Sequence, residues 1–579
     1  MRRASVFVLI VTAVTVGSAA ESSGVDTRDA PTKGPVSFVN APQATLNSDL
    51  RRGGGVDDTD AMQRVLDRAK DGSAVHLLID GPALVSGLNV YGNTTIECTE
   101  GGGFYLKDNS DRAILRNAHR SRGEVIDEHI TVRGCFFNGN RQHQLRMSSK
   151  PLQERQEPDG TVKSGLQFLG VNYLTVENVT LWNIRSFGVL IANAKFIHIS
   201  NLTVDSALPA YPGASSIAEQ RKYLRSNIDG VHFNGPIQYL TINGLKLRTE
   251  DDALALNAND MDVDDMTATN DMGPYVGQGP ITDVVVSNVV LMDALQGIRL
   301  LSSDQRIDRV VIQNVTGTVR HRMAILSHFI IPSHTGNFGS ILFSTVNVQP
   351  ERSATWSELY PDWYKHQSEW DINEEGELPL FSLNASIANL RLQGIMTQVI
   401  DGRPVIRVGR DSNIRTLSVD MDVDDPSMQA IPIKLMAGGH VDRLNFSLNW
   451  IGRSVDVGSR PIQYDGGTIA HLHWISTPPK YVGAAVTKSD PHVIIATFSQ
   501  IVKQSDLLKG VEVRISGQVA RVLDATQLGK GDTVRYRISP AATLQKTVTW
   551  AYDGAQGTIQ NLDGDNMLSV SATSVSHTQ

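Results

Sequence analysis

Three acidic residues near the middle of the chain carry the clearest chemical signal. Asp229 lies two residues before the apolar-alternating run Val231–Phe233, and the pair Asp251 and Asp252 comes just before the run Leu254–Leu256. The two runs begin 23 residues apart, at positions 231 and 254. This spacing is typical of one coil of a parallel β-helix, so the runs are expected to stack as neighbouring strands. Stacking would bring three carboxylates together.

Clustered carboxylates can divide the work of an acid and a base. Their repulsion raises the pKa of one group while another stays ionised. A protonated acid beside an ionised base is what cleavage of a glycosidic bond requires. Arg299 lies in a third run, Ile298–Leu300, and is expected to hold a substrate carboxylate or hydroxyl and to tune the acids. His232 is expected to point outward on the coil of Asp229, where it either supplies an imidazole to the site or simply lines the cleft. The simpler alternative is that these acids are turn residues of a solenoid.

A repeated pattern supports the stacked arrangement. From about residue 75 to 476, short alternating segments recur, each closed by Asn, Gly or Asp, as in LTVENVTLWNI, VVVSNVVLMDA and VVIQNVTGTV. Apolar residues would fill the interior of each coil, and Asn residues at equivalent turns would hydrogen-bond along the axis. An antiparallel sandwich would show more Asn-Gly and Asp-Gly turns. We therefore interpret the Asn-x-Ser/Thr sequons inside the repeat as turn residues.

The ends of the repeat define the domains. Within 46–476, a helix capped by Asp58 or Thr59 is expected to close the first coil. At 477 the repeat gives way to amphipathic strands, which predict a separate small β-sandwich over 477–579. Its stretch TVTWAYDGAQGTIQNLDGDNMLSV resembles the terminal strands of immunoglobulin-like accessory modules, so an immunoglobulin-like module is expected. Residues 1–20 are typical of a signal peptide and 21–45 of a flexible leader, so we expect a secreted or periplasmic protein.

Composition narrows the possible partners. The net charge of −8 favours no nucleic-acid partner, and no apolar run is long enough to cross a membrane. The two cysteines, Cys98 and Cys135, fit either a disulfide or two buried thiols. No cofactor or metal is expected, because the acidic stretch 260–265 lacks the glycine and glutamate of a calcium loop. The oligomeric state is not readable.

At the acidic motifs the chain resembles the polygalacturonase-type glycoside hydrolases of the pectin-lyase-like superfamily, which are right-handed parallel β-helices. Asn227-Ile228-Asp229 corresponds to the N-T-D motif of that family, and Glu250-Asp251-Asp252 to its G-D-D motif. Gly297–Leu301 shares only Arg299 with the R-I-K motif. The resemblance implies that Asp251 is the general acid, that Asp229 and Asp252 activate water for inversion, and that Asn227 contacts substrate.

The departures from the family concern substrate recognition. No G-H-G motif lies between Asn257 and Arg299, and Leu301 replaces the Lys of R-I-K. The expected substrate is therefore a plant or algal polysaccharide or oligosaccharide whose sugar is not specified. Long insertions at 207–226, 258–280 and 351–378 are expected on the binding face. Trp356 and Trp363 in the last one fit sugar-stacking platforms or a short packed helix equally well.

Two other functions remain open from the sequence. A polysaccharide lyase on the same scaffold would use Arg299 or His232 as its base. A non-catalytic carbohydrate-binding solenoid would also suit the C-terminal module.

Overall fold

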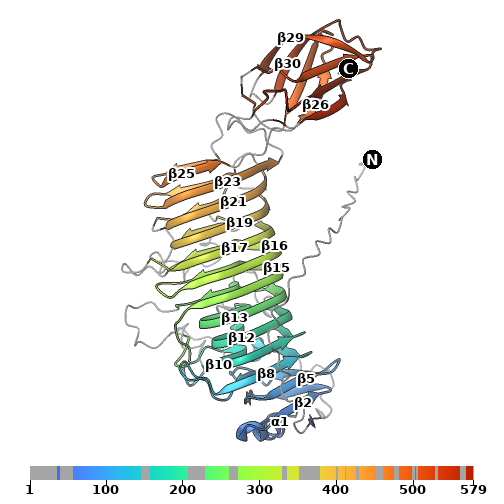
Figure 1. The fold of residues 1–579 in the computed structure, drawn as a ribbon. Coiled ribbons are helices and arrows are strands. Elements are labelled where there is room, and N and C mark those ends of the chain that lie inside the picture. The colour runs from blue at the N-terminus through green and yellow to red at the C-terminus, as the bar shows by residue number, and fades with distance from the viewer. Residues whose placement is uncertain are drawn as a thin grey trace, which may run out of the picture.

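The computed structural model describes most of the chain with gaps. The described residues are 36–39, 56–144, 157–206, 229–259, 272–328, 335–350, 379–399, 402–410, 412–425, 430–451, 461–474, 481–498, 502–503, 506–528, 533–560, 567 and 569–577. The predicted parallel β-helix is confirmed: stacked coils form a long solenoid whose strands pair in parallel (Figure 1). Three ladders of strands run along it.

The ladder that carries the acidic motifs is called the site sheet here. It consists of β4 (Leu88–Val90), β7 (Leu115–Asn117), the first parts of β10 (Ser164–Glu177), β12 (Phe187–Asp205) and β13 (Val231–Arg248), then β14 (Asp252–Asn257), the last parts of β15 (Ile281–Leu301) and β16 (Ile307–Ser327), and β18 (Phe381–Asn384), β20 (Pro404–Val408), β22 (Ile431–Met436) and β24 (Ile462–Asp465).

The other two ladders close the coils. The second consists of β1 (Val36–Val39), β2 (Val75–Ile79), β5 (Thr94–Cys98), β8 (Asp127–Arg133), further parts of β10, β12, β13, β15 and β16, and β17 (Phe338–Pro350), β19 (Ser386–Gln398), β21 (Asn413–Asp424), β23 (His440–Ile451) and β25 (Thr468–Trp474). The third begins with β3 (Pro82–Val85), β6 (Gly103–Leu106), β9 (Phe136–Asn138) and β11 (Thr180–Trp182) and continues in the later long strands.

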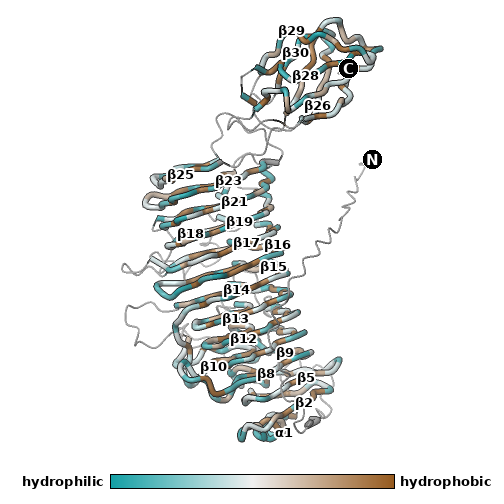
Figure 2. Tube along the Cα trace, viewed as in Figure 1, coloured by the Kyte–Doolittle hydropathy of each residue, from teal (hydrophilic) through white to brown (hydrophobic). Residues whose placement is uncertain are grey.

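Alternation of side chains along each strand builds the core. Apolar residues of all three ladders point into one continuous interior, and hydrophobic and hydrophilic residues alternate along the coils (Figure 2). Helix α1 (Thr59–Leu66) closes the first coil and inserts Met62 and Leu66 into that interior. Its cap differs from the prediction: neither Asp58 nor Thr59 caps with its side chain, and Asp57 Oδ1 accepts the Thr59 N–H at 2.9 Å. Short 3-10 helices follow at η2 (Asp67–Asp71) and η3 (Arg141–His143).

The predicted asparagine ladder is present at one turn of the coil. Asn201 Nδ2 donates to Asn178 Oδ1 at 3.0 Å, and Asn314 Nδ2 donates to Asn288 Oδ1 at 3.2 Å. These four residues all have φ between 50 and 60°, a left-handed conformation that Asn tolerates. The turn residue of each coil is thus fixed by backbone geometry as well as by the ladder. Nearby, Cys98 and Cys135 form a disulfide between adjacent coils.

A second β unit follows the solenoid. Its strands are β26 (Tyr481–Val486), β27 (Val493–Phe498), β28 (Val511–Ile515), β29 (Gln518–Leu528), β30 (Thr533–Ser539), β31 (Val548–Tyr552), β32 (Val570–Ser574) and β33 (Ser576–His577). They are mostly antiparallel and enclose a core of their own around Trp550 and Tyr536. Its immunoglobulin-like class stays a prediction.

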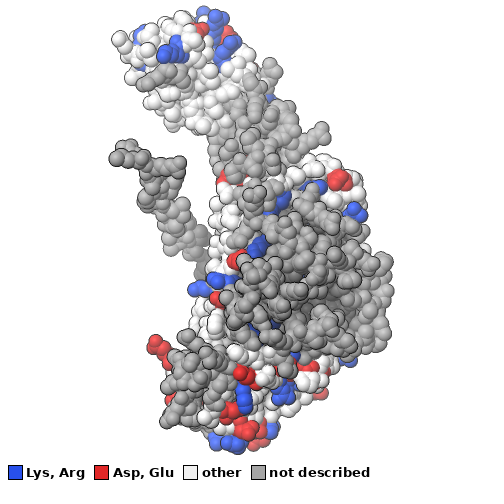
Figure 3. Space-filling view, turned by 180° about the vertical axis from the view of Figure 1, so that it is seen from behind, with Lys and Arg blue, Asp and Glu red and all other residues white. Residues whose placement is uncertain are grey.

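Two surface properties bear on function. On the face seen in Figure 3, basic and acidic side chains of the described residues are interspersed rather than gathered into a large field of one sign. Among the described residues, no helix combines the length and apolar character needed to cross a membrane.

A column of glycines lets the coils approach closely beside the acidic motifs. A Cβ on Gly188 would lie 2.5 Å from the carbonyl oxygen of Gly230, and one on Gly230 would lie 2.4 Å from that of Ala253. Both distances are shorter than a real Cβ contact, so a side chain there would force adjacent coils apart.

We therefore predict that Gly230→Ala lowers the free energy of unfolding by about 1–3 kcal/mol, as overpacking does elsewhere. Gly483→Ala is the matched control, because no atom lies within 4 Å of its added Cβ. Urea unfolding of both variants measures the difference. Equal stability of the two variants would contradict the close approach.

Candidate active site

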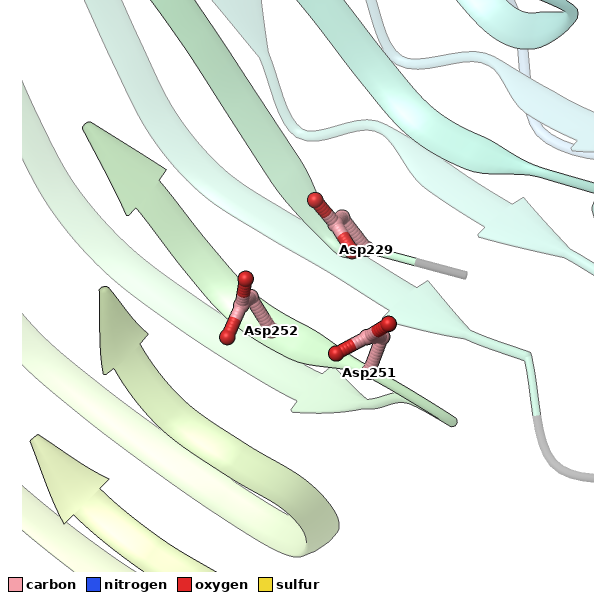
Figure 4. A group of neighbouring side chains, drawn as sticks. All are labelled: Asp229, Asp251 and Asp252. Carbon is pink, nitrogen blue, oxygen red and sulfur yellow. The ribbon is translucent and has the colours of Figure 1, made fainter. Parts of the chain in front are cut away.

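The three acids meet at the edge where the site sheet begins. Asp229 immediately precedes the glycine before β13, and Asp251 and Asp252 lie at the start of β14 on the next coil (Figure 4). Each residue offers a carboxylate oxygen, and the three oxygens lie within 4.8 Å of one another. Asp229 and Asp252 are buried and Asp251 is partly exposed, so the cluster is less accessible than a surface patch.

The strand register accounts for this meeting. Leu254 pairs with Val231 on one side and with Ile298 on the other. The outward residues between them follow the same register, so His232, Ala255 and Arg299 lie on three successive coils. Coils are spaced by about 4.8 Å, which keeps side chains at equivalent positions within contact distance.

His232 is a buried partner of Asp229 rather than a cleft-lining side chain. Its Nδ1 lies 2.5 Å from Asp229 Oδ2, and its Nε2 lies 3.4 Å from Asn257 Nδ2. An amide nitrogen can only donate, so Nε2 accepts and Nδ1–H donates to the carboxylate. The ring also stacks on Phe187, with centroids 4.5 Å apart. Asp229 Oδ2 therefore accepts a hydrogen bond from a buried imidazole.

Arg299 and Gln296 approach the other two acids. Arg299 Nη1 lies 3.6 Å from Asp252 Oδ2, and the side chain of Arg299 is 26% exposed. Gln296 pairs in register with Asp252, and its Nε2 donates to Asp251 Oδ1 at 3.4 Å. The sequence reasoning missed Gln296. The signal was available, since Gln296 lies two residues before an inward Ile298, as Asp252 does before Leu254.

The cluster holds a proton more tightly than isolated carboxyls do. Burial raises the pKa of Asp252 well above its ordinary value, and the charges of Asp251 and then Asp229 raise it further. Arg299 acts in the opposite direction. Among the neighbouring charges, that of Asp251 contributes most to the raised pKa of Asp252, because the two carboxyls repel each other when both are ionised.

An arginine from a later coil holds the turn that carries the pair. Arg320 Nη2 donates to the carbonyl of Thr249 at 2.7 Å, and its Nη1 donates to Glu250 Oε2 at 3.1 Å. The Thr249 hydroxyl donates to the carbonyl of Asp251 at 2.9 Å. These bonds fix the backbone on which Asp251 and Asp252 stand. The role of Arg320 in holding this turn was not predicted from the sequence either.

Three buried oxygens of the site have no hydrogen-bond partner among the described residues. They are Asp229 Oδ1, Asp252 Oδ1 and Gln296 Oε1, at one register position on successive coils. A buried acceptor without a donor is costly, so such a row suits a ligand that brings donors, such as water and sugar hydroxyls. The three carboxylates are also close enough together to share a metal ion.

The remaining predicted contacts fall outside the described residues. These are Asn227, Trp356 and Trp363, together with the insertions 207–226 and 351–378. Their roles stay predictions. Of the insertion 258–280, the described end contributes Met272, Tyr275 and Val276 to an apolar cluster over the site sheet.

Comparison with protein families agrees with this geometry. Residues 124–317 match the family described as Glycosyl hydrolases family 28, a segment that contains Asp229, Asp251, Asp252, Gln296 and Arg299. The resemblance to polygalacturonase-type hydrolases is thereby confirmed for this part of the chain. The match supports a glycoside hydrolase. A search of curated proteins found no match.

Solved structures with a similar course of the chain are distant in sequence. A Yersinia enterocolitica family 28 exopolygalacturonase has 12% identity and a TM-score of 0.39, with 76% of this chain and 78% of that chain covered. An endo-xylogalacturonan hydrolase from Aspergillus tubingensis has 14% identity and a TM-score of 0.39, covering 70% and 96%. A mutant tailspike protein of E. coli bacteriophage HK620 has 9% identity and a TM-score of 0.45, covering 86% and 88%.

The raised pKa of Asp252 predicts a pH-dependent cost to stability. Above the ordinary value of 3.8 the unfolded chain releases this proton while the folded chain retains it, so stability falls as pH rises from there toward the folded pKa. Asp252→Asn removes the effect. We predict that the variant is more stable than the wild type at pH 7 and that the difference shrinks toward pH 4.

Asp283→Asn is the control of opposite sign. Its hydrogen bonds from Arg309 are the main cause that lowers the pKa of Asp283 to about 2. The stability that Asp283 contributes is therefore present above 3.8 and lost as pH falls toward 2. This variant should be less stable than the wild type at pH 7. Urea unfolding at both pH values measures the differences, and a destabilising Asp252→Asn would contradict the electrostatic account.

Proposed function

We propose that this protein is an exported glycoside hydrolase that cleaves a plant or algal polysaccharide with inversion at the anomeric carbon. The observation that carries the proposal is the meeting of three carboxylates from two coils, where burial and the charge of Asp251 raise the pKa of Asp252. The family 28 match over the same residues supports the reaction class. The signal-peptide pattern of residues 1–20 supports export.

The roles follow from charge and exposure. By the resemblance Asp251 is the general acid, and it is the more exposed carboxyl of the pair, so a glycosidic oxygen can reach it. Burial raises the pKa of Asp252, and the attraction of Arg299 for the carboxylate of Asp252 lets the proton pass to Asp251 when substrate binds. Asp251 donates this proton to the glycosidic oxygen as the bond to the anomeric carbon breaks. Asp229, whose Oδ2 accepts a hydrogen bond from His232, takes a proton from water while the water oxygen bonds to that carbon. Asp252 orients the water through Oδ1.

Distance alone does not decide the stereochemistry. The carboxylate oxygens lie within 4.8 Å of one another, whereas inverting enzymes generally separate their two carboxyl groups by about 6.5–9.5 Å. Inversion is therefore proposed from the resemblance, in which one acid protonates and two activate water. Anomer analysis of the first product by nuclear magnetic resonance tests this part of the proposal independently.

Removal of the acid should abolish turnover without unfolding the protein. We predict that Asp251→Asn lowers kcat by about 10²–10⁴-fold, the usual contribution of a general acid, on any polysaccharide that the wild type cleaves. Reducing-end release from a polysaccharide panel measures it. Asp420→Asn, an exposed change on the second ladder, is the matched control. A fully active Asp251→Asn protein would contradict the assignment of Asp251 as the general acid.

A lyase is the alternative that one observation favours, because the three carboxylates could share a cation. A lyase would form unsaturated sugars with strong ultraviolet absorbance and would lose activity with a calcium chelator. We predict that reducing ends appear without such absorbance and that chelation leaves the rate unchanged. Absorbance rising in step with reducing ends would replace hydrolysis by elimination.

A further inference from the structure

The outward face of the site sheet changes character at one coil boundary. On β13 the outward residues are His232 and Asn234, both polar. Their register partners on β12 are Leu190 and Ala192. An apolar pair at outward positions of the sheet indicates that other residues cover it, and both side chains are fully buried.

Two described segments form that cover. Val162, Met272 and Val276 pack with Leu190 and Ala192, and also with Leu169 on β10, in one apolar cluster. The two segments are tied to each other, because the Val162 N–H donates to the carbonyl of Met272 at 2.9 Å. We call Val162, Met272 and Val276 the wall.

Charged groups hold the outer side of the wall in place. The guanidinium of Arg120 lies over the ring of Tyr275, 4.5 Å from its centroid. The same arginine pairs with Asp159 at 2.7 Å. Gln167, on β10, is fully buried beneath the wall and donates to the carbonyl of Val162 at 3.0 Å. The wall is therefore packed and hydrogen-bonded to the solenoid at several points.

The apolar cluster of the wall reaches the coil that carries Asp229. Phe187 belongs to the apolar cluster and stacks directly on His232, the partner of Asp229. One coil, about 4.8 Å, separates the covered strand β12 from β13. A sugar chain lying along the axis over Asp229, Asp252 and Arg299 therefore meets the wall within about one coil of the acids, on the side away from the partly exposed Arg299.

We propose that this enzyme acts on chain ends: the wall stops the terminal sugar beside the acids, and each hydrolysis releases a mono- or disaccharide. This inference rests on the proposed hydrolase. The reaction is ordinary hydrolysis, in which water adds its oxygen to the anomeric carbon and the departing sugar keeps the glycosidic oxygen as a hydroxyl. What the wall fixes is the position of the bond that breaks.

Product length and viscosity test the mode of cleavage. The probe is whichever polysaccharide of the panel the wild type cleaves fastest, with random acid hydrolysis of the same polymer as reference. Chain-end action predicts mono- and disaccharides from the first time points. It also predicts a viscosity loss several-fold smaller than in the reference at equal reducing-end release. Early long oligosaccharides with a viscosity loss that follows the reference would overturn the inference.

Smaller side chains in the wall should let a sugar chain bind further past the acids. The double variant Met272→Ala/Val276→Ala should release longer products and lower the viscosity faster per bond cleaved, with circular dichroism as a check of folding. Val285→Ala is the matched control, because Val285 is exposed on the second ladder. A folded double variant with unchanged products would count against the wall. If that variant does not fold, the wild-type product pattern still decides.

Binding separates this inference from the proposed reaction. If the wild type releases no reducing ends, the hydrolase proposal fails, and affinity electrophoresis in gels containing each polymer tests recognition of ends by itself. Recognition of ends predicts several-fold stronger retardation by a partially hydrolysed polymer than by an equal mass of the intact one. Equal retardation by both, or none in any gel, would overturn the inference.

Discussion

In-register stacking of the coils is the constraint on which the rest of the structure depends. Parallel strands spaced by about 4.8 Å place equivalent positions of successive coils side by side, whatever the length of chain between them. Asp229, Asp252 and Gln296 therefore meet although the third is separated from the second by a long insertion. The glycines at 188, 230 and 297 keep the backbones close at this edge.

The rigid coils hold three carboxyl groups that repel one another when ionised. Three acids are brought together in a largely buried position, where Arg299 pairs with Asp252, His232 hydrogen-bonds to Asp229 and Gln296 donates to Asp251. Such a cluster is tolerated because the surrounding coils fix it through Arg320 and through the backbone ladders. The chemical result is a carboxyl, Asp252, whose pKa lies above its ordinary value. A raised carboxyl pKa is also the property that acid catalysis uses.

Much of this arrangement could be predicted by counting along the sequence. The period of the alternating runs placed Val231, Leu254 and Ile298 in one register, and the structure has this pairing. Asn178 and Asn201 were expected at stacked turns and are there. Residue spacing predicts the register because every coil repeats the same backbone geometry.

The spacing of residues along the sequence could not predict the contacts that side chains make across coils. The ring of His232 turns onto Asp229 because Asn257 and Phe187 hold it there, and neither residue is marked by the repeat. The reach of Arg320 to Glu250 crosses more than one coil and has no local signature. The wall likewise joins residues 162 and 272, which only the folded chain brings together.

The distribution of the site over consecutive coils has a consequence for how such a chain can change. Gain or loss of a whole coil away from the wall and Arg320 leaves every register intact, since coils pack mainly on their neighbours. The same event between Asp229 and Arg299 would leave the hydrophobic interior equally continuous while separating the acid pair from its partners. Coil number is therefore free to drift at the ends of this solenoid and is fixed in its middle.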